Sequence, residues 1–263
     1  MARSALKNIC KLIEESQVEV AVQDAFLRDL KRSIELTDEQ NARKPSMSYK
    51  PSSMQCMRNM YYQRIGVEPD KGNANSCLIG ICESGTDRHE RVQNAVSRMK
   101  YNGIDCEYID VEKFVRERNL QDIAVVGKQG NETKLYNTTY NISFLCDGII
   151  RYKGHYYILE IKTESVYKWT NRTGVDPSHE NQATAYSISL DLPEVIFLYI
   201  NRDNCDMKAY LYKPNEEQKA DLVSMILACE TAVKASAVPP KPEDLPRKVC
   251  EYCSYKTQCR KDL

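Results

Sequence analysis

Two runs rich in β-branched and aromatic residues occupy the centre of the chain, at 142–152 and 155–163, and only Lys153 and Gly154 separate them. A two-residue connection containing glycine between two such runs is typical of a β-hairpin. The surrounding pattern predicts further strands at 104–111, 195–201 and 207–212, and helices at 84–99, 112–120, 176–190 and 215–236. Ser178 is the expected N-cap of the helix that ends at Leu190, and 131–137 is expected to be a polar loop. Together these elements predict an α/β fold.

Composition narrows the class of protein. Of 263 residues, 42% are hydrophobic and 28% charged, which is enough for a core and excludes disorder as the main state. Basic and acidic residues both number 37, so a generally basic nucleic-acid-binding surface is excluded and only a local one remains. No apolar run approaches the ~20 residues that cross a bilayer, and the N-terminus lacks the apolar block of a signal peptide. We expect a soluble cytoplasmic protein.

The chain divides into three segments by pattern. Residues 1–42 are expected to form a helical N-terminal segment, and 43–237 the core domain. Residues 238–263 begin with a proline-rich connector, which cannot be helical, and end in a cysteine-rich tail.

The hairpin carries the first candidate site. Asp147 stands among apolar residues, where a lone carboxylate is costly to bury. Glu160 and Lys162 flank Ile161, so they point to one face of a strand while Ile161 points to the other. A turn at 153–154 would bring Asp147 close to Glu160, and two adjacent carboxylates repel unless a proton or cation lies between them. Oxygen ligands of this kind prefer Mg²⁺ or Mn²⁺. The hairpin alone leaves a second interpretation equally open, a Glu–Lys cross-strand pair with Asp147 in a turn.

Asp147 followed by Glu160-Ile161-Lys162 resembles the core motif of the PD-(D/E)xK nuclease superfamily. Two further motifs narrow the resemblance. Residues 85–90 are similar to the G-x-x-x-H-E motif of RecB-type nucleases, whose histidine corresponds to His89, and Gln182 and Tyr186 fit their Q-x-x-x-Y motif. The resemblance runs from about residue 52 to 259 and does not cover the first forty residues. It implies a restriction-endonuclease-like core, in which helices flank a mixed central sheet.

The resemblance also implies roles for individual residues. His89, Asp147, Glu160 and the carbonyl of Ile161 would hold the metal, and Lys162 would assist the attacking water. Gln182 and Tyr186 would support the active site on the substrate side and contact DNA. We also expect His179, one turn before Gln182, to approach the phosphate.

A second candidate site lies in the tail. Cys250, Cys253 and Cys259 offer three thiolates at ligand spacing, one short of a tetrahedral site. The cysteines resemble the iron–sulfur branch of RecB-like nucleases, which includes the CRISPR-associated RecB-like exonucleases and the AddB nuclease domain. That resemblance supplies Cys56 as the fourth ligand and implies a [4Fe–4S] cluster that packs the tail onto the core. Ligand count alone fits a structural Zn²⁺ equally well.

The stretch 43–64 is basic, lacks acidic residues and contains tyrosines. Cations and aromatic faces together suit single-stranded nucleic acid, so Arg58, Tyr61 and Tyr62 are candidate DNA contacts. An equally weighted alternative is that the tyrosines pack beneath the cysteine cluster.

The predicted function is that of a metal-dependent DNA exonuclease acting on single strands or DNA ends. Its setting would be recombination, repair, phage DNA metabolism or CRISPR adaptation, with DNA as partner and proteins of those processes as further partners. The alternative is an accessory DNA-binding subunit of such a complex without catalysis of its own. The carboxylates and the lysine argue against it, because a binding module does not need them.

Overall fold

The computed structural model describes residues 2–40, 46–70, 75–243 and 245–262. The chain forms two compact units, one of Met1–Lys44 with Asn73–Ser84, the other of Pro45–Gly72 with Gly85–Leu263. The predicted boundary at 42–43 lies outside the described residues. Among the described residues, no helix is long and apolar enough to cross a membrane.

The first unit is helical. Helix α1 (Ala2–Gln40) is followed by the beginning of α3 (Ser76–Arg98), and the carboxylate of Glu35 accepts a hydrogen bond from the backbone N–H of Ser76 at 3.2 Å. The predicted N-terminal helical segment is thus confirmed over the residues that the structure describes. Helix α3 begins at Ser76, earlier than the predicted 84.

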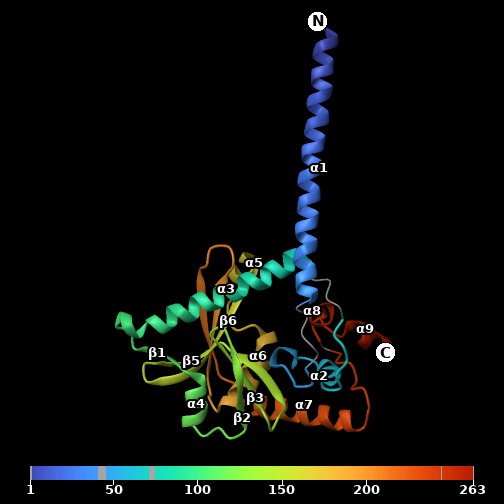
Figure 1. Ribbon diagram of the computed structural model, residues 1–263. Helices are drawn as coiled ribbons and strands as arrows, with labels where there is room; N and C mark the ends of the chain where they lie inside the picture. Colours follow the sequence, from blue (N-terminus) through green and yellow to red (C-terminus); the bar gives the residue numbers. More distant parts are fainter. Residues whose placement is uncertain (1, 41–45, 71–74, 244, 263) are drawn as a thin grey trace. The chain divides into compact units, whose positions relative to one another are not determined.

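The second unit is built on a five-stranded mixed sheet, which confirms the predicted α/β class (Figure 1). The order is β1-β5-β6-β7-β8, and only the β6–β7 pair is parallel. The strands are β1 (Cys106–Ile109), β5 (Gly148–Tyr152), β6 (His155–Glu164), β7 (Val195–Asn201) and β8 (Met207–Tyr212).

The predicted hairpin is confirmed as β5–β6. Lys153 and Gly154 both take positive φ angles, 48° and 83°, as a tight two-residue turn between twisted strands requires. The run 142–152, however, is not one strand. It breaks at Asp147, and its first half, β4 (Ile142–Cys146), belongs to a second sheet.

That second sheet is a three-stranded antiparallel meander of β2 (Ile123–Gln129), β3 (Glu132–Asn137) and β4. The prediction of a loop at 131–137 was wrong. A two-residue turn of Gly130 and Asn131, with Gly130 at φ 57°, closes a hairpin there, and the polar strand that follows still buries Thr133 and Leu135 on one face.

Helices cover both faces of the five-stranded sheet, and side-chain alternation decides which residues meet which helix (Figure 1). Ile150, Leu159 and Ile161 share an apolar cluster with Val92 of α3. Their neighbours on the opposite face, among them Ile149 and Ile158, share a larger cluster with α6 (Pro177–Leu190). Glu160 and Lys162 therefore lie on the α6 side.

Helix α6 begins differently from the prediction. Asp176, not Ser178, is its N-cap, and the Asp176 carboxylate accepts a hydrogen bond from the backbone N–H of Ser178 at 3.0 Å. Pro177 follows the cap, where the missing N–H of proline costs nothing.

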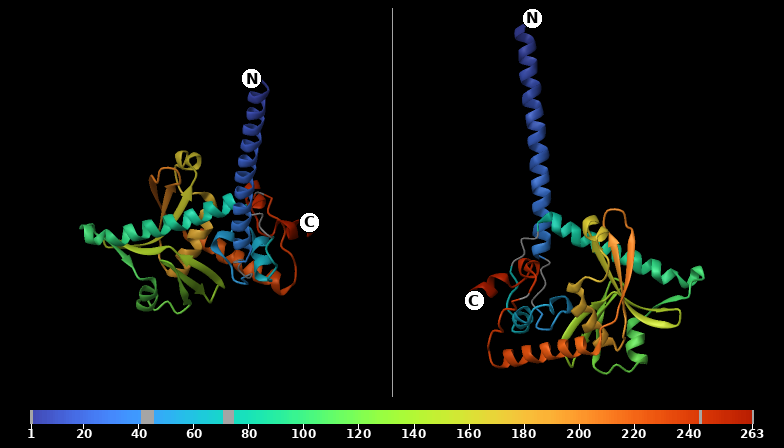
Figure 2. Two further views of the ribbon diagram at one scale, coloured as in Figure 1. Left: turned by 45° about the horizontal axis from the view of Figure 1, so that its top comes forward. Right: turned by 180° about the vertical axis from the view of Figure 1, so that it is seen from behind.

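The remaining helices surround this core and include those of the C-terminal tail. They are η1 (Pro51–Ser53), α2 (Met57–Arg64), η2 (Lys100–Asn102), α4 (Val111–Glu117), α5 (Val166–Thr170), α7 (Glu216–Lys234), α8 (Arg247–Glu251) and α9 (Lys256–Lys261). The tail lies beside α2 (Figure 2). Asp262 accepts hydrogen bonds from Arg58 through its carbonyl, at 2.9 Å, and from the Tyr62 hydroxyl through its carboxylate, at 2.7 Å.

Candidate functional site

Asp147 lies between β4 and β5, where the chain passes from the three-stranded sheet to the five-stranded sheet. Its carbonyl is bonded by the side chains of Gln93, at 2.7 Å, and Tyr108. Its carboxylate accepts a hydrogen bond from the backbone N–H of Ile161 at 2.7 Å. The carboxylate, only 5% exposed, is thus fixed against β6, one residue from Glu160.

Four of the predicted site residues form one hydrogen-bonded group on the α6 face of the sheet. Glu160 Oε1 lies 2.7 Å from Lys162 Nζ, and it also accepts a hydrogen bond from Gln182 Nε2 at 2.7 Å. Gln182 Oε1 accepts from Lys162 at 3.0 Å, while Gln182 Nε2 lies 2.7 Å from the Tyr186 hydroxyl. The strand supplies the charged pair, and the helix supplies the amide and phenol that hold it.

The second oxygen of Glu160 has no such partner. Glu160 is only 3% exposed, so Oε2 is buried, and yet this oxygen accepts no hydrogen bond. Burial and the nearby charge of Asp147 raise the pKa of Glu160 to about 7, against the opposing effect of Lys162. A buried carboxylate oxygen without a partner costs free energy, so this atom marks a place where a cation would be stabilised.

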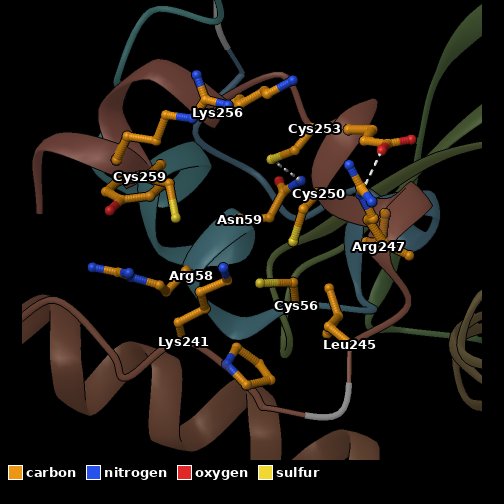
Figure 3. Close-up of a pocket in the computed structure, with 15 residues that line it drawn as sticks. Cys56, Arg58, Asn59, Lys241, Leu245, Arg247, Cys250, Cys253, Lys256 and Cys259 are labelled. Atoms are coloured by element: carbon orange, nitrogen blue, oxygen red, sulfur yellow. Dashed lines mark hydrogen bonds and ion pairs between the residues drawn. The ribbon is translucent and has the colours of Figure 1, made fainter. Parts of the chain in front are cut away.

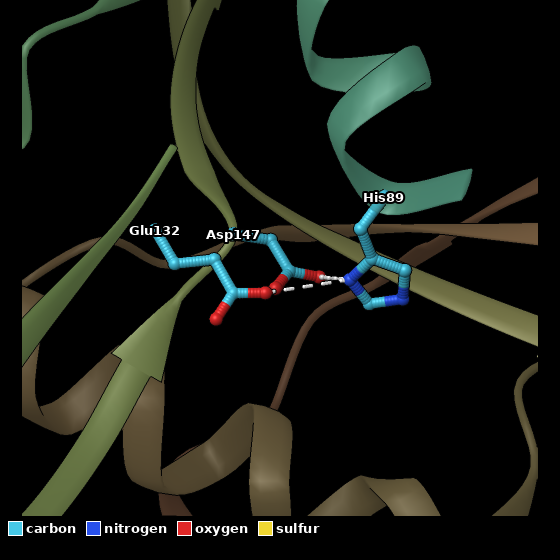
Figure 4. Close-up of side chains that lie close together, drawn as sticks. All are labelled: His89, Glu132 and Asp147. Carbon is cyan, nitrogen blue, oxygen red and sulfur yellow. Dashed lines mark ion pairs between the residues drawn. The ribbon is translucent and has the colours of Figure 1, made fainter. Parts of the chain in front are cut away.

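His89 joins Asp147 from α3, and a further carboxylate, Glu132, joins both from β3 (Figure 4). His89 Nδ1 lies 3.5 Å from Asp147 Oδ2 and 3.6 Å from Glu132 Oε1. The three ligand atoms all lie within 4.8 Å of one another. Burial lowers the pKa of His89, but its bonds to Asp147 and Glu132, with the charge of Glu160 added, outweigh burial and raise it to about 9. The imidazolium therefore balances the carboxylates in this structure.

These residues fit a divalent cation. Carboxylates with one imidazole suit Mn²⁺ or Mg²⁺, and metal binding would release the proton of His89. Sequence reasoning missed Glu132 because 131–137 was expected to be a loop. The Gly130-Asn131 pair was the signal that could have placed Glu132 on a strand beside β4.

Two further predicted site residues take other positions. The side chain of Ile161 is buried on the opposite face of the sheet, while its backbone stays at the site through the bond to Asp147, so a metal ligand role of its carbonyl stays a prediction. The His179 ring stacks on Phe197 and Tyr199, with Nδ1 3.0 Å from the Tyr199 hydroxyl. Burial, helped by Lys162, lowers the pKa of His179 to about 3, so the ring is neutral and has no charge to offer a phosphate.

The candidate DNA contacts on α2 need correction. Arg58, Tyr61 and Tyr62 are 4%, 4% and 1% exposed, so none presents a surface on which a base or phosphate could lie. Arg58 and Tyr62 instead bond Asp262 in the tail, and Tyr62 packs against Tyr255. These three residues therefore agree better with the alternative interpretation of this stretch, in which it packs beneath the cysteine tail.

The four predicted cysteine ligands line one cavity of about 290 Å³ (Figure 3). Cys56 comes from the start of α2, and Cys250, Cys253 and Cys259 come from the tail. Burial raises the pKa of Cys56, and so do the charges of Cys259 and Cys250, as expected of thiols that face a common space. The Cys253 sulfur already accepts hydrogen bonds from Asn59 and from the backbone N–H of Tyr255.

The size and the lining of the cavity bear on what it could hold. Among the residues described by the structure, no three of these sulfur atoms lie within 4.8 Å of one another. Tetrahedral zinc with bonds of about 2.3 Å would hold them roughly 3.8 Å apart. A water molecule occupies about 30 Å³ of liquid, so the space accommodates a polyatomic group. Most charged residues lining it are basic and suit an anionic group: Arg58, Lys241, Arg247, Lys256 and Arg260, with Glu251 as the acidic exception.

Comparison with known proteins adds little. No protein-family model matches the chain, and no curated protein matches it. Among solved structures, one described as the crystal structure of SSO0001 covers 90% of this chain and 98% of its own, with 16% identity and a TM-score of 0.47. A likeness this loose leaves function to be argued from the two sites themselves.

Proposed function

We propose that the protein is a metal-dependent deoxyribonuclease with a restriction-endonuclease-like core of RecB type. It would act as an exonuclease on single-stranded DNA or DNA ends. One observation carries the proposal. A buried pair of carboxylates, Asp147 and Glu160, leaves one oxygen without a partner directly beside a lysine that shares the face of β6. A Glu–Lys pair with a purely structural role would require neither the unpartnered oxygen of Glu160 nor the carboxylate of Asp147 beside it.

Glu132, His89, Asp147 and Glu160 would hold Mg²⁺ or Mn²⁺. When bound, such a cation polarises a phosphoryl oxygen and lowers the pKa of a water molecule. Lys162 then orients the water or stabilises the charge that develops on the phosphate. Gln182 fixes Lys162 and Glu160 together through its two amide atoms. Burial raises the pKa of Tyr186 well above its usual value, so its hydroxyl stays protonated and anchors the amide of Gln182.

The cysteine cavity would hold a [4Fe–4S] cluster in a structural role. The cluster would be bound by Cys56, Cys250, Cys253 and Cys259. The separation of the sulfur atoms and the basic lining favour an anionic polyatomic group over structural Zn²⁺. Because the ligands come from both ends of the second unit, the cluster would close a long loop of the chain and stabilise a tail with little apolar core of its own.

Resemblance supplies the cellular setting of the proposal. We place the protein in the cytoplasm of a bacterium, an archaeon or a phage-infected cell, with DNA as substrate. Recombination, repair, phage DNA metabolism or CRISPR adaptation would use it together with other proteins of those processes.

The test is cleavage of end-labelled single-stranded DNA with Mn²⁺ or Mg²⁺, with a closed circular strand as a parallel substrate. Linear DNA should be degraded and the circle spared, because an exonuclease needs an end. Lys162→Ala should lose at least ~100-fold in rate while retaining most Mn²⁺ affinity, since lysine is not a ligand. Asp147→Ala and Glu160→Ala should lose Mn²⁺ binding and cleavage together. Lys213→Ala removes an exposed lysine of the same unit and should cleave normally.

Near-normal turnover by Lys162→Ala would remove this assignment. Absence of cleavage by the wild type, together with DNA binding that Glu160→Ala leaves unchanged, would support the accessory DNA-binding role instead.

A further inference from the structure

Helix α1 carries a regular seven-residue repeat. Leu6, Ile13, Val20, Leu27 and Ile34 recur every seven positions, and three residues after each of them stand Ile9, Ser16, Gln23, Leu30 and Thr37. We call these ten positions the heptad seam. Every charged residue of α1 falls outside it. This is the pattern of the a and d positions of a coiled coil.

The described part of the seam is open. Ile9, Leu27 and Leu30 are 52%, 48% and 45% exposed, and the neighbouring Leu12 and Phe26 are 64% and 67% exposed. Leu12 and Phe26 each precede a seam residue and widen its apolar face. Isolated exposed apolar residues are normal, but apolar residues that recur at heptad spacing along one face of a helix mark an interaction surface.

The period and the length of the repeat bear on what covers this stripe. On a straight helix, positions seven residues apart rotate about the helix axis by about 20° per heptad. A seven-residue repeat kept over five heptads therefore matches a partner helix that supercoils with α1 better than it matches a globular surface. A helix of 39 residues is about 58 Å long, whereas a compact unit of about 200 residues is roughly 40 Å across. The second unit of the same chain is therefore too small to cover the whole seam.

The charge distribution indicates a second copy of α1 running in the opposite direction. Only charges at the e and g positions, which flank the seam, face a partner helix. Among them, Arg3 and Asp38 are e positions near opposite ends of α1, while Glu19 is a g position and Asp24 the e position that follows it. A parallel pair would place Glu19 of each helix beside Asp24 of the other, whereas an antiparallel pair places Arg3 of each helix near Asp38 of the other.

We propose that α1 is a coiled-coil segment through which two copies of this chain associate in antiparallel orientation. Ile9 of one copy would then pack near Ile34 of the other. The polar residues Ser16, Gln23 and Thr37 lower the stability of the pair and restrict its register. The proposal does not depend on the nuclease assignment.

The experiment measures the mass of the full chain by sedimentation over a range of concentrations. The wild type should dimerise. Leu27→Glu with Leu30→Glu places charges in the seam and should raise the dissociation constant at least ~100-fold. Val22→Glu with Leu36→Glu is the matched control, because it replaces two exposed apolar residues of the same helix outside the seam. The control should dimerise like the wild type.

A charge reversal tests the orientation at low salt, where surface charges are least screened. Arg3→Glu should weaken the dimer, and adding Asp38→Arg should restore it, because both residues occupy e positions. A parallel pair would show neither effect and would overturn the orientation. A monomeric wild type, or a control pair that dissociates as far as the seam pair, would overturn the proposal.

Discussion

At the residue scale, the chemistry concentrates on carboxylates that the fold buries close together. Glu160 is held by Lys162 and Gln182 through one oxygen and by nothing through the other. Glu132 and Asp147 share His89. Glu160 Oε2 is buried without a hydrogen bond and the charge of Asp147 lies close to Glu160, so a cation would stabilise this group.

Glu132 is expected to contribute to metal affinity. Replacing Glu132 with alanine removes one oxygen ligand and should weaken Mn²⁺ binding by about 10- to 100-fold, measured by titration calorimetry. Glu117→Ala removes an exposed glutamate of the same unit and is the control. Unchanged Mn²⁺ affinity in Glu132→Ala would show that the triad of His89, Glu132 and Asp147 is held together by its hydrogen bonds alone.

His179 should make the fold sensitive to acid. Burial lowers its pKa to about 3, whereas an unfolded histidine titrates near 6.5. Below pH 6.5 the unfolded chain therefore binds a proton that the folded chain does not, and stability falls as the pH drops toward 3, by up to about 1.4 kcal/mol per pH unit. His179→Phe retains an aromatic ring for stacking on Phe197 and should flatten this slope.

Denaturant unfolding between pH 4 and 7 measures the slope directly. His155→Gln, which replaces an exposed histidine at the start of β6, should leave it as in the wild type. The account of His179 is wrong if the wild type and His179→Phe lose stability in parallel over this range.

At the scale of elements, the break at Asp147 organises the site. β4 ends in one sheet and β5 begins in another, so Asp147 sits where the two sheets meet and can face β3, β6 and α3 together. Gly148, directly after the break, lies against the Tyr108 ring, and Tyr108 bonds the Asp147 carbonyl. A glycine is required here by close approach, since a Cβ atom would come within 2.7 Å of the tyrosine.

Gly148→Ala should therefore displace Tyr108 and loosen Asp147. We expect a loss of about 1–3 kcal/mol in the free energy of unfolding, typical of overpacking, together with weaker Mn²⁺ binding. Gly127→Ala in β2 is the matched control, because a Cβ atom there meets nothing within 4 Å. Equal stability of the two variants in denaturant titrations would show that Tyr108 yields without cost.

In the molecule as a whole, hydrogen bonds connect the beginning of the second unit with its C-terminal tail. The backbone N–H of Asp70 bonds the carbonyl of Ser254 at 2.6 Å, and the Asp70 carboxylate accepts from the backbone N–H of Thr257 at 2.9 Å. Asp262 meets α2 in the same region. These contacts surround the cysteine cavity, so a group bound there would lock both ends of the unit at once.

Purified without oxygen, the protein should be brown and contain about four irons per chain. Replacing Cys56, Cys250, Cys253 or Cys259 with alanine should bleach the colour and lower the melting temperature, because cluster binding is coupled to folding. Cys77→Ala replaces an exposed cysteine of α3 and should retain the colour and the melting temperature of the wild type. A colourless protein with one zinc per chain would show that zinc, and not an iron–sulfur cluster, occupies the site. Colour that persists in Cys56→Ala would remove Cys56 as the fourth ligand.

Local sequence patterns were sufficient to predict relations between residues that are near neighbours in the chain. The alternation of a strand placed Glu160 and Lys162 on one face, and the Lys153-Gly154 turn fixed the hairpin that carries them. The 3.6-residue period of α6 placed Gln182 and Tyr186 on one side of a helix. Backbone geometry sets these relations within a few residues, so a local pattern is enough to predict them.

Relations between residues far apart in the chain could be seen in the folded structure but not in local patterns. Sequence gave no sign that β4 and β5 belong to different sheets, although that break brings Glu132 beside Asp147. Nor did a basic, tyrosine-bearing stretch reveal that Arg58, Tyr61 and Tyr62 would be buried beneath a tail nearly two hundred residues away. Burial is settled by which surfaces the folded chain presses together, and the same arginine or tyrosine can face water or an interior with no change in the local pattern.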